Sequence, residues 1–408
     1  MKNKTTEWTR RDFLTAFAAA SAAFTLHPFA SWAIDDIDPR VAAIVAATIG
    51  IDTHNHIDVP LTKAELPGPD IDIAGEMKRS GLSAICMTFA LDYQRLDQPG
   101  QAYERFIIGL AVMSQQLERN GIKRALNFSD LQAAHKKHQP TVIQSIEGCH
   151  FLEGQLSRVA EAYKLGLRHL TLLHDSDASV PLGDVYTNPP KYNGLTQLGI
   201  DVVKECNRLG ILVDMAHAST DTLKAAIKTS TKPIIISHTG LDTQLGQNPF
   251  MAKMMRPRLI SKENAKLVAD AGGVIGVWTH LADTPLEYAK NIRALVDVVG
   301  ADHVCIGTDT KLTPPYRPPG DFGFGPKPQG NPQGDKPANR PDGPPPNGKG
   351  PNGGRPGERI NEAWEGQKTG FYYAVVDALL KTGFTKDEIT KIGGANFCRI
   401  FDAATKVG

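Results

Sequence analysis

Histidines and carboxylates in this chain close several short apolar runs, where their side chains could share metal ions. The runs are GIDTHNH, VIQSIEG, ILVDMAH, PIIISH and VCIGTD, and the polar residues within or after them include His54, His56, Glu147, His217, His238 and Asp309. Mixed imidazole and carboxylate ligation suits zinc, with manganese or cobalt as substitutes. A bound divalent metal lowers the pKa of water toward 7 and so generates hydroxide at neutral pH. The pattern therefore indicates a metal-dependent hydrolase.

Each residue also has a simpler interpretation. Glu147 ends an apolar run, and a carboxylate buried there without a partner would be costly, so an ion pair or metal ligation is expected; ligation is favoured. A single histidine after an apolar run is more often a core residue with satisfied hydrogen bonds. His217 and His238, at the ends of consecutive runs, together favour ligation. Asp309 would contact a metal and take the proton of bound water.

The elements that position these residues alternate between strand and helix. The apolar, β-branched runs predict strands at 47–53, 83–89, 141–146, 168–173, 211–216, 233–237, 273–278 and 303–308. Helices are predicted between them, for example at 195–209, and again at 362–381 and 386–392. Eight such strands predict an α/β fold, a (β/α)8 TIM-type barrel, although an open doubly wound sheet has the same alternation.

Two segments depart from this alternation. Residues 313–357 are dominated by Pro, Gly, Asn and Lys, which predicts a disordered insertion after the eighth strand; it would be a passive loop, a lid or a partner-binding segment. Residues 1–33 have the pattern of a twin-arginine signal, with Arg10 and Arg11 before a short apolar run. We therefore expect an exported, periplasmic protein whose mature chain, 34–408, is the hydrolase barrel and has no transmembrane span.

Net charge and cysteine content narrow the expected binding partners and the expected covalent cross-links. The formal net charge is +1, and no basic stripe is present, so nucleic acid is not an expected partner. The 5 cysteines are widely spaced and contain no CxxC, which argues against a disulfide framework. The sequence leaves the oligomeric state open between a monomer and a homodimer.

Seven blocks, in order, resemble the membrane dipeptidase (renal dipeptidase) family, metallopeptidases with an amidohydrolase-type barrel. The blocks are IDTHNHIDVP, SIEGCHFLEG, GLRHLTLLH, GLTQLGIDVVKECNRLGILVDMAHAS, PIIISHTG, CIGTD and IGGANFCRIF, and the similarity runs over about 48–404. It implies two divalent metal ions, with zinc expected, bridged by Glu147. One ion would be held by His54 and the residue at position 56, and the other by His217 and His238, with Asp309 as the base.

The resemblance also implies substrate-binding roles for two residues. His174 would stabilise the developing oxyanion, and Arg258, in RPRLIS, would bind the substrate's carboxylate. A core or second-sphere histidine and a solvated loop arginine are the respective alternatives. One position departs from the family, which commonly has aspartate where this chain has His56. Imidazole keeps a ligand but raises the net charge of the site by one.

The expected function is that of an exported metal-dependent dipeptidase that hydrolyses a dipeptide amide bond with a metal-bound hydroxide. His56 and the insertion favour an alternative, a related amidohydrolase that acts on a non-peptide amide, a lactone or a modified amino acid. A catalytically inactive barrel that binds partners through 313–357 is a third interpretation. The retained ligand set argues against the third interpretation.

Overall fold

The computed structural model describes residues 37–93, 95–186, 189–316 and 357–406. The predicted export signal at 1–33 lies outside the described residues, as does most of the predicted insertion at 313–357. The described residues belong to the compact unit that begins at Ile37.

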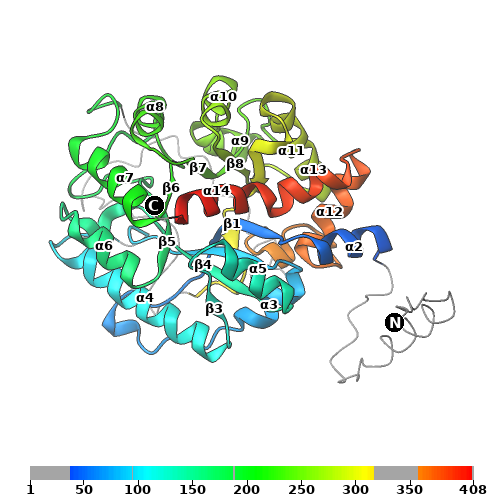
Figure 1. Cartoon of the computed structure of the whole chain (residues 1–408), viewed down its shortest axis with the longest axis horizontal. Coiled ribbons are helices and arrows are strands. Elements are labelled where there is room, and N and C mark those ends of the chain that lie inside the picture. The colour runs from blue at the N-terminus through cyan, green and yellow to red at the C-terminus, as the bar shows by residue number, and fades with distance from the viewer. Residues whose placement is uncertain (1–36, 94, 187–188, 317–356, 407–408) are drawn as a thin grey trace, which may run out of the picture. The chain divides into compact units, whose positions relative to one another are not determined.

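Eight parallel strands form a closed barrel (Figure 1). They are β1 (Ile51–His56), β2 (Ala84–Thr88), β4 (Thr141–Glu147), β5 (Leu167–Thr171), β6 (Leu212–Asp214), β7 (Ile235–Thr239), β8 (Val274–Val277) and β9 (Val304–Ile306). Pairing of Asp52 in β1 with Ile306 in β9 closes the ring. Two short strands pair in parallel with strands of the barrel: β3 (Lys123–Arg124) with β4, and β10 (Thr310–Lys311) with β1. The predicted (β/α)8 barrel is confirmed, and the open sheet is wrong.

Helices surround the strands. They are α2 (Pro39–Ala47), α3 (Ile73–Ser80), α4 (Gln101–Arg119), α5 (Phe128–Lys136), α6 (Ser157–Lys164), α7 (Gln197–Leu209), α8 (Thr220–Thr229), α9 (Pro249–Met255), α10 (Lys262–Asp270), α11 (Pro285–Val299), α12 (Phe371–Lys381), α13 (Lys386–Thr390) and α14 (Asn396–Thr405). The helix predicted at 195–209 is α7, which the Thr196 side chain caps and which ends at left-handed Gly210.

Two element boundaries differ from the prediction. Residue 47, predicted to begin a strand, ends helix α2, because Asp38 caps the backbone of Arg40 and Pro39 favours the first helical turn. The helix predicted from residue 362 begins only at Phe371, because glycines precede it, among them Gly366 in a left-handed conformation.

A hydrophobic cluster of strand residues and helix α14 closes one end of the barrel. Inward-facing residues such as Ile51 and Leu212 pack with Phe397 and Phe401 of α14, which crosses the centre of the view in Figure 1. The predicted metal ligands lie at or just beyond the carboxyl ends of the strands. All five cysteines are free and buried. Within the described ranges, no helix is both long enough and apolar enough to cross a bilayer.

Candidate metal centre

The six predicted ligands come together at the carboxyl end of the barrel. His54 and His56 are two residues apart on β1, Glu147 is the last residue of β4, and His238 lies near the end of β7. His217 and Asp309 each lie three residues beyond a strand, β6 and β9. Parallel strands bring these positions to one opening, although they are far apart in sequence.

Glu147 is the centre of the cluster and is buried. Five imidazole Nε2 atoms lie around its two carboxylate oxygens. The distances are 3.0 Å for His217, 3.3 Å for His54, 3.4 Å for His174, 3.5 Å for His238 and 3.6 Å for His56. His174, predicted only as a substrate contact, is thus close enough to group with Glu147 and His217 as a candidate ligand.

Asp309 completes a second group with the two histidines of β1. Its Oδ1 lies 3.3 Å from Nε2 of His56 and 3.8 Å from Nε2 of His54. Its Oδ2 lies 2.8 Å from Nε2 of His280, on the loop after β8. The Tyr93 hydroxyl lies 3.2 Å from the His56 ring nitrogens. His280 and Tyr93 carried no signal in the sequence, because neither follows its apolar run directly.

Two of the ligand candidates have strained backbones. His217 has a φ of +66° and Asp309 a φ of +55°. This left-handed conformation costs a non-glycine residue about 1–2 kcal/mol. Backbone hydrogen bonds hold it: the Asp309 amide donates to the His54 carbonyl at 3.1 Å, and the Tyr186 amide donates to the His217 carbonyl at 3.1 Å. Such strain at non-glycine residues is concentrated at functional sites.

The contacts among these groups are those of a site that needs a cation. Nε2 of His217 and Nε2 of His238 are 2.9 Å apart, so a proton or a metal must lie between two nitrogens that would otherwise repel. Nδ1 of His217 faces the carboxylate of Asp175 at 3.0 Å, which leaves Nε2 to face the cluster. Glu147 Oε2 is buried without a hydrogen-bond partner among the described residues. These residues therefore fit a divalent metal.

The protonation states agree with this conclusion. Burial would raise the pKa of Glu147, but His174 and His54 hold it well below its ordinary value. Burial and the neighbouring His54 lower the pKa of His238 to about 3, so its imidazole is neutral, the form that binds metals. Burial would likewise raise the pKa of Asp309, and His238 and His280 hold it well below its usual range. Burial would lower the pKa of His217, but Asp175 and Glu147 raise it to about 10, so its imidazole holds a proton where no metal is bound. The cluster thus combines ionised carboxylates with a neutral His238 and a protonated His217, and binding of a divalent cation there would release that proton.

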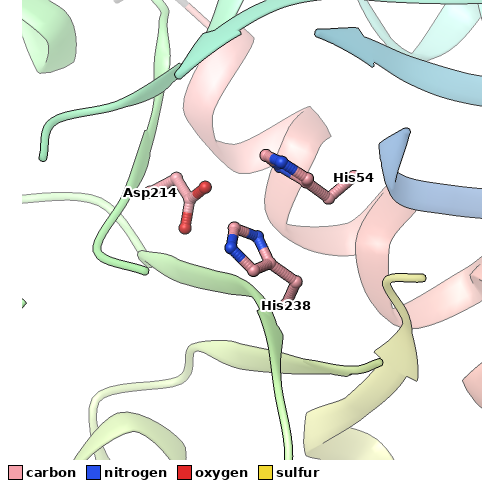
Figure 2. Close-up of side chains that lie close together, drawn as sticks. All are labelled: His54, Asp214 and His238. Atoms are coloured by element: carbon pink, nitrogen blue, oxygen red, sulfur yellow. The ribbon is translucent and has the colours of Figure 1, made fainter. Parts of the chain in front are cut away.

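Asp214 is a further carboxylate beside the cluster. Figure 2 shows its side chain directed toward His238, and the ring of His54 lies close to both residues. Its Oδ1 accepts hydrogen bonds from the amides of Ala216 at 3.0 Å and Ser237 at 2.9 Å, and its Oδ2 accepts one from the Thr171 hydroxyl at 2.5 Å. Because its oxygens are engaged, Asp214 holds the ends of β5, β6 and β7 in place. Asp214 lies inside the run ILVDMAH and not at its end, so the pattern of run-closing residues did not indicate it.

Arg258 lies at the end of the 3₁₀ turn η4 (Arg256–Arg258), and its side chain is 25% exposed. It forms an ion pair with Asp175, the residue after His174. The structure therefore connects Arg258 to the cluster through Asp175 and His217. Sequence reasoning did not single out Asp175, although it directly follows a predicted site residue.

Comparisons with known proteins agree with this architecture. Residues 39–315 match the family model of membrane dipeptidases (Peptidase family M19). The chain is 29% identical to dipeptidase verJ of Clonostachys rogersoniana over 170 residues, which span 40% of this chain and 41% of that protein.

Solved structures show the same fold. An amidohydrolase from Pseudomonas aeruginosa superposes with a TM-score of 0.66 at 19% identity, covering 89% of this chain and 98% of the other. The probable dipeptidase PvdM from the same organism gives a TM-score of 0.66 at 16% identity, covering 91% and 100%.

Proposed function

The chain belongs to the membrane dipeptidase family, and from this premise we propose that it is a metal-dependent dipeptidase. The observation that carries the proposal is the gathering of five imidazole Nε2 atoms within 3.0–3.6 Å of the Glu147 carboxylate. We further propose, from Arg10 and Arg11 of the leader, that the protein is exported to the periplasm.

We propose that two divalent ions, with zinc expected, occupy the cluster. His54, His56 and Asp309 would hold one ion, and His217 and His238 the other, with Glu147 between them. When bound, such ions lower the pKa of water toward 7 and polarise a carbonyl, which provides a nucleophile at neutral pH. The left-handed backbone at His217 supports this assignment, because it directs the side chain into the cluster at an energetic cost.

The protein's own residues would move protons and bind the substrate. Asp309 Oδ1 faces the cluster while His280 contacts Oδ2, so this carboxylate is oriented to accept a proton and pass it to the leaving amine. Burial would lower the pKa of His174, but Glu147 and Asp92 raise it, which favours an imidazolium able to donate to an oxyanion. Arg258 would receive the carboxylate of the dipeptide.

A second candidate is the hydrolysis of a non-peptide amide, a lactone or a modified amino acid. The ion pair between Arg258 and Asp175 favours it, because the cation expected to bind a free carboxylate already has a partner. A panel of L,L and L,D dipeptides, assayed beside N-acyl amino acids and lactones, tests both. Turnover of dipeptides supports the first function, and turnover confined to the other substrates supports the second.

A further inference from the structure

Arg258 faces a carboxylate of the protein itself. One terminal nitrogen of its guanidinium forms an ion pair with Oδ2 of Asp175, and the other donates a hydrogen bond to the Met254 carbonyl at 3.3 Å. Both arms of the guanidinium fork therefore have protein partners within the chain. A substrate carboxylate would have to share this cation or displace a partner from it.

Asp175 is fixed in this position by further contacts. Its Oδ1 accepts a hydrogen bond from the Tyr186 hydroxyl and lies 3.0 Å from Nδ1 of His217. The ring of Tyr186 also lies beside Arg258, with its centroid 5.7 Å from the guanidinium carbon. The Asp175 side chain is 35% exposed, so an incoming ligand meets its negative charge. Movement of Asp175 away from Arg258 would break these contacts together.

We infer that Asp175 determines how the site discriminates at the carboxyl end of its substrate. Its charge offsets that of Arg258 and repels a second carboxylate, so a free carboxylate gains little over a neutral group at the same position. The remaining guanidinium N–H groups still donate to a neutral carbonyl. The site would therefore accept an amide, ester or lactone carbonyl about as well as a free carboxylate. This inference rests on the proposed amide hydrolysis.

The test compares L-Ala-L-Ala and L-Ala-D-Ala with their C-terminal amides, in the full-length metal-loaded protein. For the wild type, the kcat/KM of the better free dipeptide and that of its amide should agree within about threefold. Asp175→Asn keeps the size of the side chain and an oxygen that accepts from Tyr186, but removes the charge. We expect Asp175→Asn to raise the ratio of kcat/KM for the free dipeptide to kcat/KM for its amide at least tenfold. Because this ratio is internal to each variant, it is insensitive to a general loss of activity through His217.

Two further variants make the result specific. Asp177→Asn removes a nearby carboxylate that pairs with Lys191, and it should leave the ratio unchanged. Adding Arg258→Gln to Asp175→Asn should abolish the increase in the ratio of kcat/KM values that Asp175→Asn alone produces. A wild type that prefers the free acid more than thirtyfold, or an Asp175→Asn ratio within twofold of the wild type, overturns the inference.

A binding measurement separates this inference from the proposed function. If no dipeptide is hydrolysed, the proposed function fails, and calorimetric binding of alanine against alaninamide still tests Asp175. Asp175→Asn should then favour alanine at least tenfold more than the wild type does. An unchanged binding ratio overturns the inference whatever the turnover.

Discussion

Asp92 lies 2.6 Å from Nδ1 of His174, although 82 positions separate the two residues in the sequence. The same carboxylate accepts a hydrogen bond from the Ser176 hydroxyl at 2.5 Å, and Nε2 of His150 lies 3.7 Å from it. Because a carboxylate accepts only, the proton of His174 Nδ1 stays on Nδ1 and the ring is fixed with Nε2 toward Glu147. Asp92 is thus the residue that orients His174.

Replacing Asp92 with asparagine should therefore lower kcat more than it changes KM. The amide leaves a contact to Nδ1 but removes the charge that favours the imidazolium, and we expect a fall of about 10- to 100-fold in kcat. Steady-state kinetics on a dipeptide measure this. Asp270→Asn, an exposed position on α10, is the control and should not differ from the wild type. An unchanged kcat in Asp92→Asn would show that His174 does not act through this contact.

Glu147→Gln should abolish hydrolysis and leave the barrel folded. The substitution removes the carboxylate charge that all five imidazoles share and turns one oxygen into a donor, so the cluster loses its central carboxylate. Metal content should fall with activity, while the circular dichroism spectrum stays that of the wild type. Retained metal with wild-type turnover would remove Glu147 from the ligand set.

His56→Asp should strengthen metal binding. Aspartate restores the family's common residue and lowers the net charge of the site by one, so we expect divalent ions to bind at least roughly tenfold more tightly. Competition with a chromophoric chelator measures the change for zinc, manganese and cobalt. The same substitution at exposed His138 serves as the control. Weaker binding in His56→Asp would mean that the imidazole of His56 is the better ligand here.

Asp184 should stabilise the segment between β5 and α7 in a pH-dependent way. Its buried carboxylate accepts from the amides of Lys191 at 2.6 Å, Tyr192 at 3.0 Å and Gly194 at 3.1 Å. Asp184→Ala leaves these donors without partners and should lower the free energy of unfolding by about 2–4 kcal/mol. Asp221→Ala, at an exposed position, should change it by less than about 0.5 kcal/mol.

The loss of unfolding free energy in Asp184→Ala should depend on pH with a definite sign. Burial would raise the pKa of Asp184, but these backbone amides lower it below its ordinary value. The stabilisation is therefore complete above the unfolded-state pKa of about 3.9 and is lost as pH falls through the lower folded value. Chemical denaturation of both proteins between pH 3 and 7 measures it. A difference that grows on acidification would contradict this account of Asp184.

The barrel could be predicted from the sequence because its strands are fully buried and so appear as continuous apolar runs. His238 and Glu147 could be found in the same way, since each closes such a run. Asp92, Asp175 and His280 could not. They lie on loops, and their partners are 82, 42 and 29 positions away, so only the closed barrel brings them together. The left-handed backbones of His217 and Asp309 likewise depend on tertiary hydrogen bonds, which no local pattern records.

The central claim is that this cluster binds divalent metal and needs it to hydrolyse an amide bond. The most direct test is a zinc titration of chelator-treated protein, in which dipeptide hydrolysis and bound metal are followed together. We predict no turnover in the stripped protein and full activity once two equivalents are bound. Wild-type turnover by protein that contains no metal would contradict the account.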